Sequence, residues 1–272
     1  MRREEIGRAT LIRGDWRNAM KEMRDGSVDL LLSDPPYGRT NLAWDKPVDW
    51  PAFFDEARRV CKENAVIVLF AIQATAIEAI KAWRRGFRYE LVWIKKMPVG
   101  FLSANRRPLR KHELILIFCS RLHASTYNPV KEEGHQPYRR VHGGDRAAHY
   151  GTVRSGETIN KGDRYPTSTI EAGLDPPPRL HPTQKPLQVL RKLIEYYSNE
   201  GETVLDPFAG SGSTLVAAVE TGRRAIGVEK DTRMFWSAVR RIRQAVATQW
   251  VRDRKASDFR FCQLAYIRSK AS

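Results

Sequence analysis

The fold is indicated first by VDLLLSDPPY, which occupies residues 28–37. Its first part, 28–33, is an apolar run of strand length, as expected of a buried strand. The run ends in Asp34, Pro35, Pro36 and Tyr37. Because proline has no N–H, the Pro35 carbonyl can accept a hydrogen bond without a competing amide, and Asp34 beside it is a second acceptor. Two acceptors and an aromatic ring predict a pocket for the exocyclic amine of a nucleobase; a plain Asp-Pro-Pro turn is the alternative.

Outward from this stretch, strands and helices alternate. Further strands are expected at residues 9–13, 65–70, 89–94, 113–119, 203–205 and 225–228. Helices are expected at residues 16–23, 50–61, 74–84, 187–197, 213–221 and 233–250. The alternation predicts an α/β fold with a doubly wound, mostly parallel sheet.

Residues 121–180 interrupt this pattern. The stretch is rich in Gly, Pro, His, Arg and Tyr and has no sustained period. Roughly 60 irregular residues are too many for an ordinary connection, so we interpret them as a functional insertion. The predicted organisation is a catalytic domain of residues 1–120 and 181–250, an insertion of residues 121–180 and a basic tail of residues 251–272.

A second motif, DPFAGSGS at residues 206–213, lies where a strand is expected to turn into a helix. Glycines at such a turn let a ligand approach the backbone. Glu229 follows the next strand, where a carboxylate can accept hydrogen bonds from a ribose. The third glycine of GxGxxG is missing, no P-loop sequence occurs, and Asp206 would repel a pyrophosphate. A cationic cofactor such as S-adenosylmethionine therefore fits better.

The composition indicates a polyanionic partner. The net charge is +16, with +9 carried by residues 81–111 and +7 by residues 231–272. Phosphates attract such patches, although a merely solvated surface is the alternative. Three widely spaced cysteines favour a reducing cytoplasm and argue against a zinc site or disulfides, and no apolar stretch is long enough to span a membrane.

Together these motifs resemble the permuted β-class of DNA amino-methyltransferases, chiefly its adenine-N6 enzymes. The resemblance rests on the order SDPPYG (33–38), insertion, HPTQKP (181–186) and LDPFAGSGST (205–214), and spans about residues 9–235 without the insertion. It implies a Rossmann-like methyltransferase fold, S-adenosylmethionine as cofactor, double-stranded DNA as substrate and no metal. The protein would work in the cytoplasm of a bacterial cell, encoded by the bacterium or by a phage, as a monomer or a homodimer.

The resemblance also implies roles for single residues. Asp34 and the Pro35 carbonyl would hold the target amine, while Tyr37 stacks on the base and Pro36 completes the motif. The positions expected to bind the cofactor are Asp15, Thr183, Lys185, Asp206, Pro207, Phe208, Gly210, Gly212, Ser213 and Glu229. Among them, Glu229 would accept from the ribose hydroxyls, and Thr183 and Lys185 would hold the carboxylate. Asp15 would lie near the adenine.

Eleven basic residues are candidate DNA contacts. Seven would bind phosphates, namely Arg84, Arg85, Lys95, Lys96, Arg106, Arg107 and Arg110. Four lie in the insertion and would read guanine edges, namely Arg139, Arg140, Arg146 and Arg154. A disordered or solvated insertion is the alternative.

Three other functions stay open at this point. A cytosine-N4 methyltransferase uses the same geometry but usually has Ser in the first motif position, so Asp34 favours adenine. An RNA methyltransferase is possible because charge does not distinguish the two polymers. A non-catalytic nucleic-acid-binding module would not need Asp34, Tyr37, Phe208 and Glu229 together.

Overall fold

The computed structural model describes residues 1–38, 45–142, 146–147, 151–152, 156–177 and 184–270, with the backbone alone for 142, 146–147, 151–152 and 252–270. The chain divides into two compact units. The first comprises Met1–Tyr127 with Ser168–Ser272, and the second is Asn128–Thr167.

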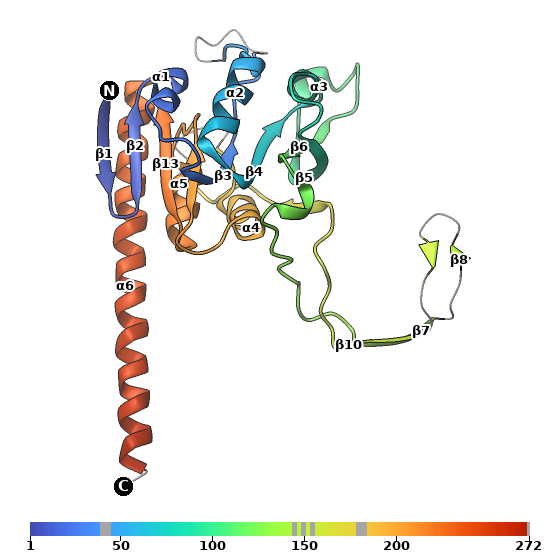
Figure 1. Ribbon diagram of the computed structural model, residues 1–272, viewed down its shortest axis with the longest axis vertical. Helices are drawn as coiled ribbons and strands as arrows, with labels where there is room; N and C mark the ends of the chain where they lie inside the picture. Colours follow the sequence, from blue (N-terminus) through green and yellow to red (C-terminus); the bar gives the residue numbers. More distant parts are fainter. Residues whose placement is uncertain (39–44, 143–145, 148–150, 153–155, 178–183, 271–272) are drawn as a thin grey trace. The chain divides into compact units, whose positions relative to one another are not determined.

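The first unit is built on a nine-stranded sheet in the order β1-β2-β13-β12-β3-β4-β6-β5-β11 (Figure 1). Its strands are β1 (Arg2–Ile6), β2 (Ala9–Arg13), β3 (Val28–Ser33), β4 (Cys61–Ala71), β5 (Phe87–Val99), β6 (Arg110–Phe118), β11 (Thr169–Ala172), β12 (Thr203–Asp206) and β13 (Arg224–Glu229). Only β1 and β6 run against the others. The expected doubly wound, mostly parallel sheet is therefore confirmed.

Helices cover both faces of this sheet (Figure 1). They are α1 (Trp16–Lys21), α2 (Trp50–Val60), α3 (Gln73–Ala82), α4 (Leu187–Tyr197), α5 (Ser213–Glu220) and α6 (Thr232–Lys270). Two short 3-10 helices, η1 (Phe101–Ser103) and η2 (Leu122–Ala124), lie in loops. The first three α-helices pack in one apolar cluster and the last three in another, so the sheet separates two cores.

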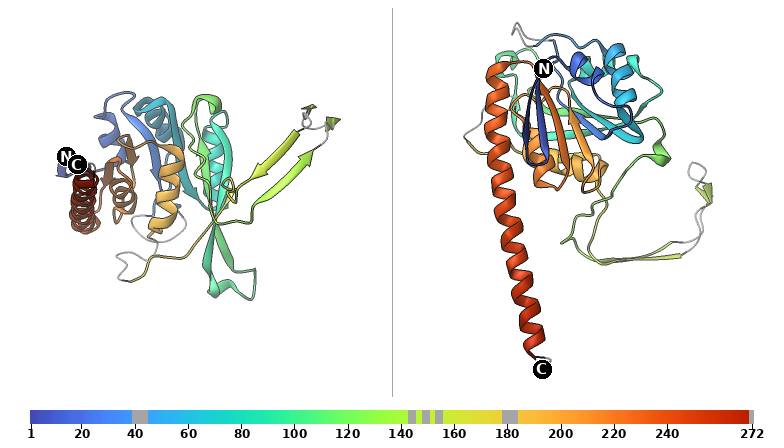
Figure 2. Two further views of the ribbon diagram at one scale, coloured as in Figure 1. Left: turned by 90° about the horizontal axis from the view of Figure 1, so that it is seen from below. Right: turned by 60° about the vertical axis from the view of Figure 1, so that its left-hand side comes forward.

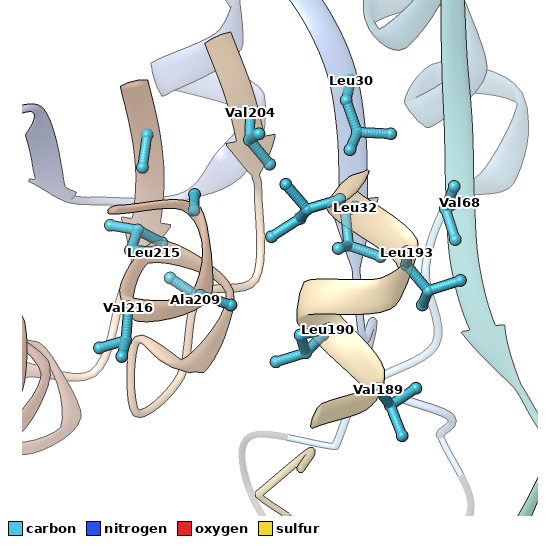
Figure 3. Packing of buried hydrophobic residues seen from close by; sticks show 14 of the residues in the cluster. Leu30, Leu32, Val68, Val189, Leu190, Leu193, Val204, Ala209, Leu215 and Val216 are labelled. Carbon is cyan, nitrogen blue, oxygen red and sulfur yellow. The ribbon is translucent and has the colours of Figure 1, made fainter. Parts of the chain in front are cut away.

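Strand β3 shows how the sequence produces this layering. All six of its residues are buried. Because successive strand residues point to opposite faces, Leu30 and Leu32 pack in the core with α4, while Leu31 packs in the core with α1 and α2. Figure 3 shows Leu30 and Leu32 beside Leu190 and Leu193 of α4. Each fully buried leucine contributes roughly 1.5 to 3 kcal/mol, which explains the continuous apolar run.

The chain reverses direction in the sheet between β3 and β12. From β3 it continues to β4 on one side, and from β12 to β13 on the other, while β3 and β12 pair in parallel at Leu30–Val204 and Leu31–Leu205. Ligands of open α/β sheets bind at such a switch point, beyond the carboxyl ends of the strands. Asp34 follows β3 and Asp206 ends β12, so both motifs lie at this place.

The second unit, Asn128–Thr167, is smaller than the expected insertion of residues 121–180. It contains the pair β7 (Tyr138–His142) and β10 (Gly156–Asn160), and the short pair β8 (Arg146–Ala147) and β9 (Gly151–Thr152). The end of the expected insertion belongs instead to the first unit, because Thr169–Ala172 pairs in parallel with β5 as an edge strand of the main sheet. Four residues flanked by irregular sequence carry too little pattern to reveal such distant pairing.

Two terminal elements also differ from expectation. The charged sequence RREEI forms β1, which pairs with β2 and has only Ile6 fully buried. Helix α6 continues past residue 250 to Lys270, into the segment expected as a tail. In the described part of the chain, no helix has both the length and the apolar character needed to cross a membrane.

Candidate active site

The candidate catalytic residues form a rigid turn after β3. Tyr37 Oη donates to Asp34 Oδ1 at 2.8 Å, and Lys185 Nζ donates to Asp34 Oδ2 at 2.6 Å. Pro35 is buried, whereas Asp34, Pro36 and Tyr37 are partly exposed. A carboxylate has about four acceptor sites, so Asp34 can still accept from a ligand. The turn thus presents an oriented carboxylate at the sheet edge.

Lys185 links this turn to a buried carboxylate that the sequence did not reveal. Its Nζ lies 3.1 Å from Glu113 Oε2, and Glu113 Oε1 accepts from Lys95 Nζ at 2.5 Å. The side chains of Lys185 and Glu113 are only 7% and 8% exposed. Buried charges are stable only when paired, and here four charges alternate from Lys95 through Glu113 and Lys185 to Asp34.

This alternation controls the ionisation of its members. Burial alone would lower the pKa of Lys185, but the charges of Asp34 and Glu113 raise it, so the ammonium stays protonated. Burial raises the pKa of Asp34, and Lys185 opposes that effect. For Glu113 burial would raise the pKa, but Lys185 and Lys95 lower it. Lys185 therefore offsets part of the effect that burial has on the pKa of Asp34.

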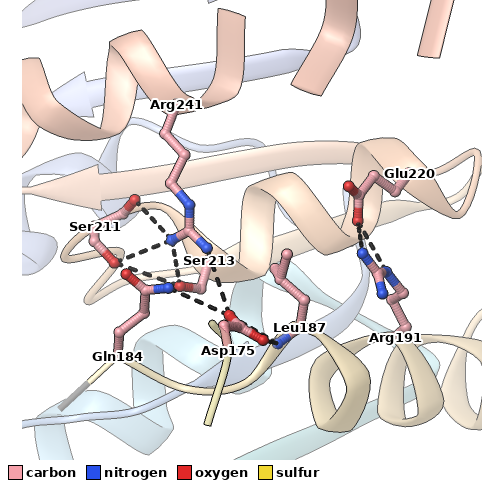
Figure 4. A network of polar contacts seen from close by, with 8 residues as sticks. All are labelled: Asp175, Gln184, Leu187, Arg191, Ser211, Ser213, Glu220 and Arg241. Carbon is pink, nitrogen blue, oxygen red and sulfur yellow. Dashed lines mark hydrogen bonds and ion pairs between the residues drawn. The ribbon is translucent and has the colours of Figure 1, made fainter. Parts of the chain in front are cut away.

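A second polar network fixes the backbone that carries Lys185 (Figure 4). Asp175 accepts from Leu187 N at 3.0 Å and from Gln184 Nε2 at 3.3 Å, on either side of Lys185. Arg241 of α6 lies 3.9 Å from Asp175 and donates to Ser213 Oγ at 2.6 Å. Ser213 therefore has a structural partner, and the segment before α4 is tied to α5 and α6.

The carboxylate of Asp206 lies next to β3. Its Oδ1 accepts from Ser33 Oγ at 2.5 Å and from Phe208 N at 3.1 Å, and the side chain is buried. Burial raises the pKa of Asp206 to about 6, the Ser33 hydrogen bond opposes this, and Asp34 adds to it. Asp34 and Asp206 are therefore electrostatic neighbours, although they lie 172 positions apart.

Glu229 lies one strand farther along. Its Oε2 accepts from Gly210 N at 2.9 Å and its Oε1 from Asp231 N at 2.7 Å, while its backbone carbonyl accepts from Gly14 N at 3.0 Å. Burial raises the pKa of Glu229. Asp15 follows Gly14 and caps α1 by accepting from Arg17 N, so it lies at the same edge.

Two glycines of the second motif serve different purposes. Gly210 has φ +51° and a side chain there would meet only the Phe208 carbonyl oxygen, at 3.9 Å, so its open side leaves room for a ligand. Gly212 has φ +77°, and a Cβ there would approach that of Ala238 to 3.1 Å. The close packing of α5 on α6 is enough to explain Gly212.

Phe208 belongs to an aromatic cluster that the sequence did not indicate. Its ring stacks on Phe53 with centroids 6.0 Å apart and lies 6.1 Å from Trp16. The side chain stays partly exposed, while the adjoining Pro207 is buried. Phe208 and Tyr37 follow neighbouring strands, as the expected shared site requires.

The site fits a cationic cofactor by its charges. The charges that act on Asp206 and Glu229 come from other acids, including Asp34 and Asp231, and within the described residues neither carboxylate forms an ion pair with Lys or Arg. Such carboxylates are costly unless a cation completes the site. A sulfonium and an ammonium would supply that charge.

Several expected site residues have charged partners within the protein. Lys185, expected at the cofactor's carboxylate, lies between Asp34 and Glu113. Lys95, expected at a phosphate, is partly buried and pairs with Glu113. Arg139 pairs with Glu157 across β7 and β10. Long-range ion pairs of this kind leave no local pattern in a sequence.

The remaining basic candidates are mostly exposed. Exposed side chains belong to Arg84, Arg85, Lys96, Arg106, Arg107, Arg110 and Arg140. Only the backbone of Arg146 is described, and Thr183 and Arg154 lie outside the described residues. Among the described residues, no three His, Cys, Asp or Glu side chains are grouped as a metal ion would require.

Comparison with known proteins agrees with the fold and the motifs. The DNA methylase family of N6 and N4 enzymes matches residues 28–240. "Putative methylase YubD" of Escherichia coli (strain K12) is 31% identical over 231 residues, covering 80% of this chain and 83% of that protein. DNA adenine methyltransferase YhdJ of the same organism is 28% identical and covers 86% of this chain and 82% of its own.

A solved structure shares the fold at lower identity. The PvuII DNA methyltransferase, described as cytosine-N4-specific, superposes with a TM-score of 0.64 over 91% of this chain and 93% of its own, at 13% identity. At this identity the likeness concerns the fold alone.

Proposed function

The chain belongs to the DNA methylase family of N6 and N4 enzymes, and from this premise we propose that it methylates the N6 amine of adenine in double-stranded DNA. The cofactor is S-adenosylmethionine. The observation that carries the proposal is the fixed carboxylate of Asp34, followed by Pro35, at the switch point of the sheet. An Asp in this first motif position favours adenine over cytosine.

Binding of the target amine needs two acceptors. The amine has two N–H donors, and Asp34 and the Pro35 carbonyl accept one each. Tyr37 is oriented by its hydrogen bond to Asp34 and offers its ring to the base. Since the N6 lone pair is delocalised into the ring, two hydrogen bonds that favour tetrahedral geometry make it available for attack.

Transfer then depends on charge and orientation. S-adenosylmethionine, when bound, supplies an electrophilic methyl group on a sulfonium. Holding the amine in line with that methyl contributes much of the rate. As the N–C bond forms, the bond between the methyl group and sulfur would break, and its electron pair would stay on sulfur as a neutral thioether. One surplus proton is then left on the amine, and Asp34 is the base already hydrogen-bonded there. Its raised pKa suits it to receive that proton.

In a duplex the adenine must leave the base stack to reach Asp34, which costs a few kcal/mol. The exposed basic side chains of the first unit, among them Lys96, Arg106 and Arg107, would offset part of this cost through phosphate contacts. We propose that the second unit, Asn128–Thr167, recognises the DNA sequence, with Arg140 as its exposed base-reading candidate.

Methylation of plasmid DNA by the purified protein tests the proposal. The DNA is digested to nucleosides for mass spectrometry, and the modified positions are mapped by single-molecule sequencing. We expect N6-methyladenine within one short sequence, and no product with the Asp34→Ala variant. Transfer RNA is the parallel substrate, and we expect much less label in it.

Other products would overturn specific parts of the proposal. N4-methylcytosine would contradict the choice of base, and preferential labelling of tRNA would contradict the choice of polymer. Replacing residues 130–165 by a short linker, which leaves β11 intact, should preserve cofactor binding and abolish sequence preference. An unchanged methylation pattern would refute the recognition role of the second unit.

A further inference from the structure

The hairpin between β5 and β6 carries exposed apolar side chains that the core does not use. Its two strands pair as far as Val99 and Arg110 and enclose the turn 100–109. Met97 is 74% exposed, Phe101 82% and Leu102 fully. Figure 2 (left) shows the hairpin, in green, extending beyond the rest of the sheet. Adjacent large apolar side chains with this exposure are unfavourable in water unless a partner covers them.

The turn is ordered by its own backbone. Gly100 has φ +93°, and Ser103 N donates to Gly100 O at 2.9 Å, Ala104 N to Phe101 O at 2.9 Å and Arg107 N to Ser103 O at 3.1 Å. These bonds close η1 and hold Phe101 and Leu102 at the tip. The tip is therefore a preformed surface of two apolar side chains.

The charge around the tip identifies the class of partner. Residues 95–112 contain six Lys or Arg and no acid. Lys96, Arg106, Arg107, Arg110 and Lys111 are exposed on both strands and in the turn. A polyanion fits such a surface, whereas an apolar protein surface would leave the cations without partners. An apolar tip surrounded by cations matches DNA, which has phosphates outside and stacked bases inside.

The hairpin also emerges at the edge of the sheet that bears the catalytic turn. β6 is antiparallel to β4, so its first residues lie at the carboxyl end of β4, and Glu113 there joins Lys185 and Asp34. Arg110, which pairs with Val99 next to the turn, acts on Tyr37 by its charge and lowers the pKa of that side chain against the larger effect of burial. From Trp93, opposite Glu113, to Val99 the strand reaches about 15 to 20 Å, which exceeds the roughly 8.5 Å depth of the major groove.

We propose that the β5–β6 hairpin enters the duplex beside the target adenine, and that Phe101 and Leu102 occupy the space in the base stack that the flipped base leaves. The inference rests on the proposed function. Apolar side chains are used in this way by other proteins that unstack DNA. Lys96, Arg106 and Arg107 would fix the hairpin on the phosphates, and the tip would lower the free energy of the extrahelical state.

The test uses the DNA site mapped above, so a failure of the proposed function shows first, as absent methylation by the unaltered protein. Two duplexes are compared, one intact and one with an abasic position opposite the target, where the adenine is already unpaired. On the intact duplex, the kcat/KM of the Phe101→Ala/Leu102→Ala variant should be about tenfold or more below that of the unaltered protein. On the duplex with the abasic position, most of this difference should disappear. With 2-aminopurine at the target, its fluorescence increase on binding should fall in parallel.

The matched control is Ile77→Ala, which removes a 49% exposed side chain from α3. It should leave both substrates unaffected, and all variants should keep the unaltered Tm and cofactor affinity. Phe101→Trp, which keeps an aromatic wedge, should retain activity on the intact duplex. The proposal is overturned if the double variant methylates the intact duplex like the unaltered protein. It is also overturned if the kcat/KM of the variant falls equally on both duplexes, because the tip would then contribute to DNA binding and not to base flipping. A change in the oligomeric state of the variant would overturn it as well, because the tip would then be a contact between copies of the chain.

Discussion

The carboxylates of Asp34 and Asp206 lie at the ends of neighbouring strands, yet their surroundings differ. Asp34 is bonded to Lys185, which a second carboxylate, Glu113, also holds in place. Among the described residues, Asp206 accepts from neutral donors, namely Ser33 Oγ, the Thr214 side chain and Phe208 N, and the charge of Asp34 acts on it with the same sign as its own. One carboxylate is compensated within the protein and the other is not.

The difference matches the charge of what each carboxylate would bind. The amine of a nucleobase is neutral, so the cation that lowers the pKa of the partly buried Asp34 has to come from the protein. A sulfonium cofactor brings its own positive charge, so a cation beside Asp206 would repel it. The protein thus places Lys185 beside Asp34, where the base would bind, and, among the described residues, places no cation beside Asp206, where the cofactor would bind.

Removing the compensated carboxylate should have the largest effect. In Asp34→Asn the amide has an N–H2 group that opposes the amine, so we expect transfer to fall at least about 1,000-fold. Cofactor affinity, measured by calorimetry, should change less than about twofold, since Asp206 and Glu229 remain. A parallel loss of cofactor binding would show that Asp34 has a structural role instead.

Removing Lys185, the cation that pairs with Asp34, should have the next largest effect. Lys185→Met takes away the charge that opposes burial, so the pKa of Asp34 rises further and the acidic limb of the kcat/KM profile moves to higher pH. We expect roughly 100-fold lower activity at pH 7. Because Glu113 then keeps only one of its two cations, Lys95, the variant Lys185→Met/Glu113→Gln should restore stability without restoring activity.

The matched control is Lys62→Met. Lys62 pairs with Asp29, at the opposite end of the same strand β3, at 2.5 Å. Its removal should leave the pH profile of the reaction unchanged. If Lys62→Met and Lys185→Met shift the acidic limb equally, the charge string has no special connection with the site.

Asp206 has no cation beside it among the described residues, so replacing it should stabilise the protein. In the free protein the pKa of Asp206 is raised to about 6 from 3.8, so its ionised form costs about 3 kcal/mol at pH 8. Asp206→Asn should therefore raise the free energy of unfolding by about 1 to 3 kcal/mol at pH 8, and the gain should vanish as the pH falls below about 4. Cofactor affinity should fall about tenfold or more. Unfolding at several pH values and calorimetry check both, and a destabilised variant at pH 8 would contradict the comparison.

The sequence was sufficient for the central elements and insufficient for the contacts between them. The apolar run 28–33 and the amphipathic pattern 187–197 predicted β3 and α4 with their observed bounds, because burial imposes the period directly. β11 was missed because its pairing with β5 is set by distant residues, and β1 because its composition is charged.

The same limit applied to the candidate site. Both motifs were predicted at strand ends, and the observed strand order brings them together at the switch point. Glu113 looked like an ordinary strand residue, since its partners Lys95 and Lys185 are 18 and 72 positions away. The one signal for Glu113 in the sequence was that a carboxylate stands among the apolar residues of a strand. Such a carboxylate is expected to be buried, and a buried charge requires a cation.

The smallest effect expected concerns the hydroxyl between the two carboxylates. Ser33 precedes Asp34, and its Oγ donates to Asp206 at 2.5 Å, so it stabilises the ionised form of Asp206. In Ser33→Ala the pKa of Asp206 should rise above about 6, because a bond that favoured the anion is lost. Stability should then decrease by about 1 kcal/mol at pH 8 and by less at pH 5, where Asp206 is protonated in the folded state. Activity should fall only through weaker cofactor binding, with kcat unchanged at saturating cofactor. A decrease in kcat instead would mean that Ser33 positions Asp34, and that the two carboxylates are less independent than their different surroundings indicate.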